Sequence, residues 1–225
     1  MSKSNLKIAI IGDYNFTYNT HHATNLALDH ASNFLEIEIS YYWIKLAEAC
    51  QFKPNQFADF DGIWISPGPY KNPFLLSGTV DLISKQNIPT FITGEGYRAL
   101  IDVIIQRNNL NAQGEKLISD NLVDGETFER MEITPHSKEL IKIYENHSNV
   151  ELTSSRYSLY PQLISYLTES DVDIEGYNQF EEPEIISLKS HDFFVSCGFC
   201  PQISSTREIP HPLIYTFLKA CLNFN

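Results

Sequence analysis

The sequence predicts an α/β fold built on a mainly parallel sheet, and two observations support this prediction. Short apolar runs that end in glycine, serine or threonine alternate with segments of helical periodicity through the first half of the chain. The chain also has 225 residues, 43% of them hydrophobic, which is enough to bury one substantial core. Because helices join successive strands, the strands should run parallel with right-handed crossovers.

The first half of the chain supplies four strand–helix units. The predicted strands are residues 6–12, 35–42, 62–66 and 89–93, and the predicted helices are 20–33, 45–50, 75–86 and 97–106. An apolar run such as Gly62-Ile-Trp-Ile-Ser66 is typical of a strand that is buried on both faces. The segment 106–114 is predicted to be a mobile insertion.

The second half predicts an antiparallel extension of the sheet. Strands are expected at 116–123 and 128–133, helices at 161–167 and 211–222, and a hairpin at 183–188 and 193–199. We find no internal repeat, low-complexity tract or linker in the sequence. Residues 1–225 are therefore predicted to form a single domain.

Composition argues against several classes of partner. Acidic residues outnumber basic ones by 28 to 16, so the net charge of -12 disfavours nucleic acid and anionic membrane surfaces. No apolar run is long enough for a membrane span, and the first residues lack a signal-peptide core. Four cysteines in a chain this long do not make a disulfide framework. We expect a cytoplasmic protein with no nucleic-acid or membrane partner.

The ends of three predicted strands are the expected ligand-binding region, because open α/β sheets bind ligands outside the carboxyl ends of their strands. These ends are Ser66-Pro-Gly-Pro69, Thr93-Gly-Glu-Gly-Tyr97 and Gly198-Phe-Cys-Pro-Gln202. The middle one has the pattern of a nucleophile elbow that presents Glu95. The simpler alternative is that Glu95 lies at a helix N-terminus, where several backbone N–H groups would hold its carboxylate ionised.

Five collinear segments, from about residue 6 to the C-terminus, resemble the glutaminase domain of CTP synthase, a class I glutamine amidotransferase. They include Phe60-Asp-Gly-Ile-Trp-Ile-Ser-Pro-Gly68 and Ile88-Pro-Thr-Phe-Ile-Thr-Gly-Glu-Gly96. The other three are residues 8–14, 155–161 and 191–210. The resemblance implies a three-layer, flavodoxin-like amidotransferase fold.

The same resemblance implies that the catalytic triad of the family is replaced. The nucleophilic cysteine corresponds to Glu95, the general-base histidine to Cys200, and the carboxylate that orients the histidine to Gln202. A glutaminase needs a thiolate, an imidazole and an acid in these places, so no glutamine hydrolysis is expected.

The resemblance also implies that part of the substrate pocket is retained. Gly68 and the N–H of Gly96 match an anion-binding nook, and Arg156 matches the clamp for the substrate carboxylate. Pro69 replaces a glycine of the oxyanion loop and has no N–H. The substrate-binding residues are therefore predicted to be Gly68, Gly96 and Arg156.

Two classes of function stay open. The first is a degenerate amidotransferase that binds a small molecule, such as an amino acid or a nucleotide-related compound, or a protein partner; a homodimer is compatible with it. The second is a hydrolase or transferase in which Glu95 is the nucleophile or general base.

No cofactor and no metal site is expected. Cys197-Gly-Phe-Cys200 lies at a strand end rather than at the start of a long helix. His21 and His22 are adjacent on one predicted helix, where their side chains point apart. Surface or capping roles are therefore predicted for these two histidines.

Overall fold

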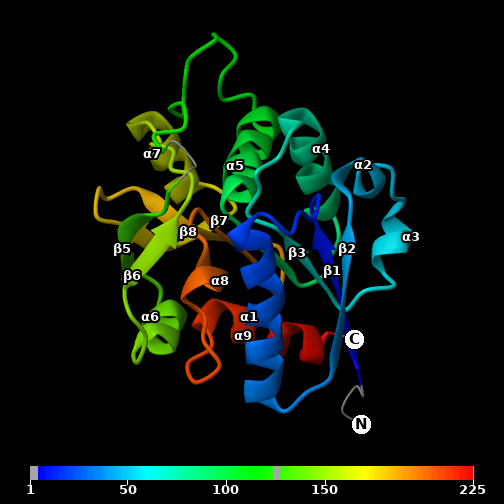
Figure 1. Ribbon diagram of the computed structural model, residues 1–225. Helices are drawn as coiled ribbons and strands as arrows, with labels where there is room; N and C mark the ends of the chain where they lie inside the picture. Colours follow the sequence, from blue (N-terminus) through cyan, green and yellow to red (C-terminus); the bar gives the residue numbers. More distant parts are fainter. Residues whose placement is uncertain (1–4, 124–126, 225) are drawn as a thin grey trace.

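The computed structural model describes residues 5–123 and 127–224 (Figure 1). Within these ranges the chain forms a nine-stranded sheet in the order β2-β1-β3-β4-β9-β8-β7-β5-β6. The strands are β1 (Leu6–Ile11), β2 (Ile39–Ile44), β3 (Gly62–Ile65), β4 (Thr90–Thr93), β5 (Glu129–Pro135), β6 (Val150–Thr153), β7 (Val172–Asn178), β8 (Pro183–Leu188) and β9 (Phe194–Cys197). The helices are α1 (Asn19–Leu35), α2 (Leu46–Ala49), α3 (Pro54–Phe57), α4 (Pro73–Ile83), α5 (Glu95–Arg107), α6 (Lys138–Tyr144), α7 (Pro161–Glu169), α8 (Pro201–Ser204) and α9 (Pro212–Asn223).

The parallel half of the sheet confirms the fold class that the sequence predicts. Strands β2, β1, β3, β4 and β9 pair in parallel, in the order of a flavodoxin-like, doubly wound sheet. β3 and β4 consist entirely of buried residues, as expected for strands covered on both faces. The carboxyl ends of β3, β4 and β9 consequently lie side by side at one edge of the sheet.

The antiparallel extension is confirmed as well. β9 pairs with β8, β8 with β7, β7 with β5, and β5 with β6, all antiparallel. The predicted hairpin corresponds to β8 and β9. This extension places β6 and the residues after it beside the carboxyl ends of the parallel strands.

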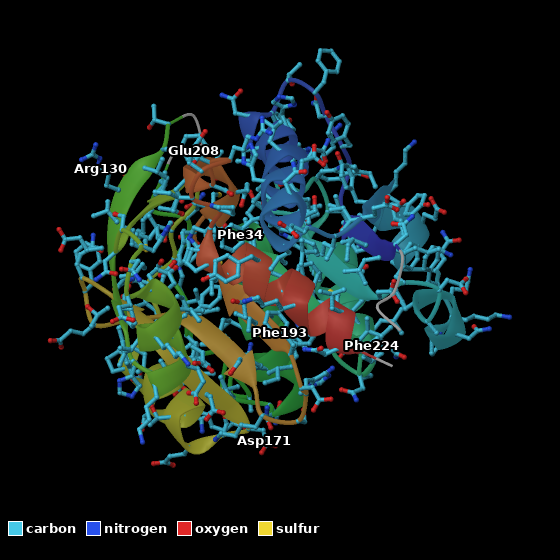
Figure 2. The ribbon with its side chains drawn as sticks, turned by 90° about the horizontal axis from the view of Figure 1, so that it is seen from below. Phe34, Arg130, Asp171, Phe193, Glu208 and Phe224 are labelled. Atoms are coloured by element: carbon cyan, nitrogen blue, oxygen red, sulfur yellow. The ribbon has the colours of Figure 1, made fainter. Side chains whose placement is uncertain are left out.

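Helices cover both faces of the sheet, which gives three layers (Figure 1). Helices α2, α4, α5 and α7 pack on one face, and α1, α6 and α9 pack on the other. Figure 2 shows α9 lying across its face of the sheet, with Phe34 of α1 beside it. The ring of Phe34 lies 5.5 Å from that of Tyr215 on α9. No helix in the described ranges combines the length and the apolar character that a membrane crossing needs.

Several predicted boundaries are wrong. The first helix continues to Leu35 and ends at Glu36, which is in the left-handed conformation, so β2 starts only at Ile39. Residues 116–123 do not form a strand; a single bridge joins Ile118 to Leu159. Five elements were not predicted: β6, β7, α6 and the short helices α3 and α8. β7 is interrupted by a register shift at Gly176, which breaks the alternation by which a strand is recognised.

Candidate functional site

The Gly-Glu-Gly elbow is a tight connection from β4 to α5. Gly94 has a φ of 58°, and a Cβ there would lie 2.7 Å from the carbonyl oxygen of Pro67, so only glycine fits. The N–H of Gly94 donates to the carbonyl oxygens of Cys197 and Phe199 at 3.0 and 3.2 Å. These contacts bind the elbow to the end of β9 and place Glu95 as the first residue of α5.

The carboxylate of Glu95 lies against the loop that follows β3. Its Oε2 accepts a hydrogen bond from the N–H of Tyr70 at 3.0 Å. Gly68 has a φ of 98°, and a Cβ at Gly68 would lie 2.8 Å from Cδ of Glu95. The loop therefore needs glycine at this position to close around the carboxylate.

The expected set of several N–H donors around Glu95 is wrong. Among the described residues, the N–H that the carboxylate accepts is that of Tyr70 in the loop after β3, and not one from the first turn of α5. Burial raises the pKa of Glu95, and the single hydrogen bond from Tyr70 offsets this only in part. The half-buried carboxylate is therefore less stabilised in its ionised form than the sequence predicts.

His21 holds the Gly68 loop through a hydrogen bond to the backbone of Gly68. It is almost fully buried, and its Nε2 lies 3.0 Å from the carbonyl oxygen of Gly68. Its Nδ1 accepts a hydrogen bond from the N–H of Asn15 at 3.0 Å, so Nε2 carries the proton and donates. Burial lowers the pKa of His21, in agreement with this neutral form. The predicted surface or capping role is wrong for His21, whereas His22 is exposed.

Cys200 and Gln202 lie on the other side of the elbow, at the start of α8. Cys200 is buried, its Sγ lies 3.7 Å from Oγ of Ser154, and its N–H donates to Leu152. Burial raises the pKa of Cys200 to about 11, although neighbouring Ser154 and Gln202 lower it. The thiol therefore stays protonated at neutral pH. The buried amide of Gln202 makes no regular hydrogen bond with the described residues.

The other two predicted binding residues lie in different surroundings. Gly96 is buried, and a Cβ there would lie 2.6 Å from Cγ2 of Ile92, so it packs against β4. The guanidinium of Arg156 lies 4.8 Å over the ring of Phe180, and its Nε is 4.0 Å from Glu129. In the described structure the Arg156 side chain does not line the cavity at the elbow.

A cavity of about 430 Å³ opens at the elbow. Its lining residues are Thr17, Tyr18, Asn19, Thr20, Gly68, Pro69, Glu95, Asn121, Thr127, Phe128 and Ser154. Of the six predicted site residues, Gly68 and Glu95 line it directly, and Cys200 contacts it through Ser154. Sequence reasoning missed Ser154, residues 17–20 at the start of α1, and the lining residues between α5 and β5, which are Asn121, Thr127 and Phe128. Only the position of residues 17–20 after the first strand could have indicated them.

A second polar cluster lies away from this cavity. The buried carboxylate of Glu151 accepts hydrogen bonds from Nε2 of His211 at 2.9 Å, from Tyr144 at 3.1 Å and from Ser204 at 3.2 Å. Nε2 of His147 lies 3.8 Å from the same carboxylate. Burial alone would raise the pKa of Glu151, but these neighbours, His211 foremost, lower it below its usual value.

The ligand atoms of His147, Glu151 and His211 are close enough together for a metal ion. However, Nδ1 of His211 accepts the N–H of Leu213 at the start of α9, so the Nε2 that a metal would need carries a proton. The hydrogen bonds of the cluster thus favour a structural role, in which Glu151 orients the cap of α9.

No protein-family model matches the chain. Among curated proteins, CTP synthase of Onion yellows phytoplasma (strain OY-M) is 27% identical over 243 residues, or 96% of this chain. CTP synthase of Rickettsia conorii is 25% identical over 258 residues, or 100% of this chain. Among solved structures, the glutaminase domain of Trypanosoma brucei CTP synthase, with bound acivicin, covers 98% of this chain and is itself covered to 95%, with a TM-score of 0.77 and 16% identity. The chain is similar in sequence to CTP synthases and in fold to the glutaminase domain of one of them.

This similarity confirms the predicted resemblance, to CTP synthases in sequence and to a glutaminase domain in fold. The amidotransferase-like chain spans less than half the length of the curated relatives it matches, at 44 and 47%. In this fold, the elbow before α5 and the loop after β3 build the cavity described above.

Proposed function

We propose that this chain is a CTP synthase-like amidotransferase domain that does not hydrolyse glutamine and that binds a small molecule in the cavity around Glu95. The observation that carries the proposal is the position of Glu95 itself. Its carboxylate occupies the elbow, where the family resemblance implies a nucleophilic cysteine. A degenerate domain of this kind keeps the pocket and loses the reaction.

This arrangement has neither the thiolate nucleophile nor the imidazole base that acyl transfer from glutamine uses. A carboxylate attacks an amide carbonyl far less readily than a thiolate does. The thiol of Cys200 has a pKa of about 11, so at neutral pH it is neither a thiolate nor a proton acceptor. The amide of Gln202 does not titrate, and it cannot orient a base as a carboxylate does.

Stabilisation of an oxyanion is weakened as well. Such stabilisation requires free backbone N–H groups that point to the place where negative charge develops. Pro69 has no N–H, and the N–H of Tyr70 already donates to Glu95. The negative charge of an ionised Glu95 would also repel a developing oxyanion next to it.

The test is ammonia release from glutamine by the purified chain. We expect no release above background, and the same result for Glu95→Ala. The control is Glu169→Gln, which changes an exposed glutamate at the end of α7. Release by the native chain that persists in Glu95→Ala would indicate a contaminating enzyme. Release that Glu95→Ala abolishes would refute the proposal.

One observation favours an alternative, an enzyme in which Glu95 is a general base or nucleophile. A half-buried carboxylate with a raised pKa that faces a cavity is a common form of catalytic acid or base. In that case Glu95→Gln should reduce turnover of the true substrate by at least ~100-fold while binding persists. In a binding domain the same change should alter ligand preference only.

The proposed location is the cytoplasm, on the composition of the sequence. A protein partner is proposed on the relationship to longer CTP synthases, of which the chain spans 44 to 47%. Size-exclusion chromatography with light scattering would show whether the chain forms a homodimer, in which the proposed protein partner is a second copy of the chain.

A further inference from the structure

We infer that the cavity around Glu95 binds a small primary amine in its ammonium form, with the ammonium group at the Glu95 carboxylate and the remaining polar groups on the neutral wall of the cavity. This inference rests on the proposed function and names the class of ligand. It starts from the chemistry of the cavity lining, in which Glu95 is the one charged side chain among the described residues.

The carboxylate of Glu95 has unused capacity to accept hydrogen bonds. Oε2 accepts one hydrogen bond, from Tyr70, and Oε1 accepts none within the described part of the chain. A carboxylate with two oxygens has room for about four such bonds. An ammonium group has three donors and a positive charge, so it would satisfy the vacant positions and neutralise the half-buried charge.

The neighbouring cations of the protein are engaged elsewhere. Arg98 donates from Nε to Asp102 at 3.0 Å and from Nη1 to Ser119 at 3.1 Å. Arg156 lies over Phe180 and beside Glu129. The neutral tautomer of His21 donates to Gly68 and adds no charge. No described lining residue of the cavity is cationic, so the ammonium group of a ligand would supply the charge that complements Glu95.

The rest of the lining suits a polar amine. Hydroxyl and amide groups dominate the wall and both donate and accept hydrogen bonds; they belong to Thr17, Asn19, Thr20, Asn121, Thr127 and Ser154. The aromatic side chains of Tyr18 and Phe128 also line the cavity, and aromatic rings attract cations. Figure 1 shows the contributing N-termini of α1 and α5 close together at the carboxyl edge of the sheet.

Anionic ligands are disfavoured by the same lining. A carboxylate or phosphate placed here would meet the charge of Glu95 without a cationic side chain among the described lining residues. The net charge of -12 adds a long-range repulsion for anions and an attraction for cations.

The experiment compares shape-matched probes that differ in charge, by calorimetry at pH 7.5. D-glucosamine is tested against D-glucose and D-glucuronate, and putrescine against 1,4-butanediol. We expect at least one amine to bind about tenfold more tightly than its neutral analogue, the scale of one charge-assisted hydrogen bond. Glu95→Gln should remove this preference, whereas the control Glu169→Gln should retain it.

Three results would overturn the inference. A neutral or anionic probe could bind as tightly as the amines, Glu95→Gln could leave the preference for amines unchanged, or no amine could bind. The first two leave the proposed function in place, because a small molecule still binds. The ammonia assay decides separately whether the proposed loss of glutaminase activity fails.

Discussion

Two glutamates of this chain, the half-buried Glu95 and the buried Glu151, have opposite surroundings. Glu95 lines a cavity, accepts one neutral hydrogen bond and has a raised pKa. Glu151 is completely buried, accepts hydrogen bonds from His211, Tyr144 and Ser204, and has a lowered pKa. Burial raises the pKa in both cases, so the number and charge of the partners decide the sign of the net shift.

The comparison teaches how to separate structural from functional carboxylates in one fold. The partners of Glu151 come from α6, α8 and the start of α9, and they use its acceptor capacity within the protein. Glu95 lines a cavity, and its hydrogen bond from Tyr70 uses only one of its two oxygens. A carboxylate of the first kind stabilises the fold, and one of the second kind reduces stability and is available for binding.

The largest effect is expected for Glu151→Gln. This change removes the charge that His211 and the hydroxyls of Tyr144 and Ser204 face, and it should destabilise the fold by about 2–3 kcal/mol at pH 7. For a chain of this size the melting temperature should fall by roughly 4–10 °C. Thermal unfolding followed by circular dichroism measures the shift.

The pH dependence sharpens this prediction. A carboxyl whose folded-state pKa is lowered contributes stability above its unfolded pKa of about 4.5 and loses it as the pH falls through the folded value. The difference in free energy of unfolding between the native chain and Glu151→Gln should therefore disappear below about pH 4.5. A variant as stable as the native chain at pH 7 would break the comparison.

A smaller effect of opposite sign is expected for Glu95→Gln. The neutral amide can still accept the hydrogen bond from Tyr70, and the cost of burying a charge disappears. Stability at pH 7 should rise, by less than the loss expected for Glu151→Gln, because the variant has no carboxyl whose ionised form burial disfavours. The folded-state pKa of Glu95 is raised, so the native chain and the variant should have equal free energies of unfolding below about pH 4.5. As the pH rises above this value, the native chain should become the less stable of the two.

Chemical denaturation at pH 4 and pH 7.5 measures this difference. The matched control is Glu169→Gln, which should leave stability unchanged at both values. A loss of stability in Glu95→Gln at pH 7.5 would mean that Glu95 is a structural carboxylate like Glu151.

The smallest effect concerns the thiols near the two glutamates. Cys200 has a pKa of about 11, so its thiolate fraction at neutral pH is on the order of 100-fold below that of an ordinary cysteine. Labelling with a thiol reagent at pH 7.5 should modify Cys50, which is partly exposed, before the buried Cys197, Cys200 and Cys221. Mass spectrometry of timed samples identifies the sites.

The charge of Glu95 contributes to the raised pKa of Cys200, and that of Glu151 to the raised pKa of Cys197. Glu95→Gln should accordingly speed the labelling of Cys200 slightly and leave Cys197 unchanged. Equal acceleration of both thiols would show general loosening of the fold rather than a local charge effect.

The sequence predicts the parallel half of the fold well because each strand there is a continuous apolar run followed by a helix. The Gly-Glu-Gly pattern also places Glu95 at the elbow, because Gly94 can adopt the positive φ that the tight turn needs and Gly96 can pack closely against Ile92. The segment 116–123 was predicted to be a strand, and this prediction is wrong. Its backbone forms hydrogen bonds with residues 156–160 instead of with a strand of the sheet. Such long-range pairing leaves no local pattern.

The side chains around Glu95 were harder to predict for a similar reason. His21 has the local sequence of a surface helix, and contacts that are distant in sequence bury it, with Gly68, 47 positions away, and with the ring of Trp43 on β2. The direction of the Glu95 side chain depends on the loop at Tyr70, so a helix-capping rule for α5 gives the wrong partner. Local sequence therefore predicts the backbone at the elbow, whereas tertiary contacts determine the burial and the hydrogen-bond partners of its side chains.

The cavity is lined partly by the ends of regular secondary structure and partly by a loop. Strand ends and the starts of α1 and α5 form the floor, whereas Asn121, Thr127 and Phe128 belong to the long connection between α5 and β5 (Figure 1). Substitutions or insertions in that connection leave the pairing of the parallel strands intact. The three lining positions are exposed, whereas Leu117 and Ile118 of the same connection are buried in the core, so a library for new ligands should vary the former and keep the latter.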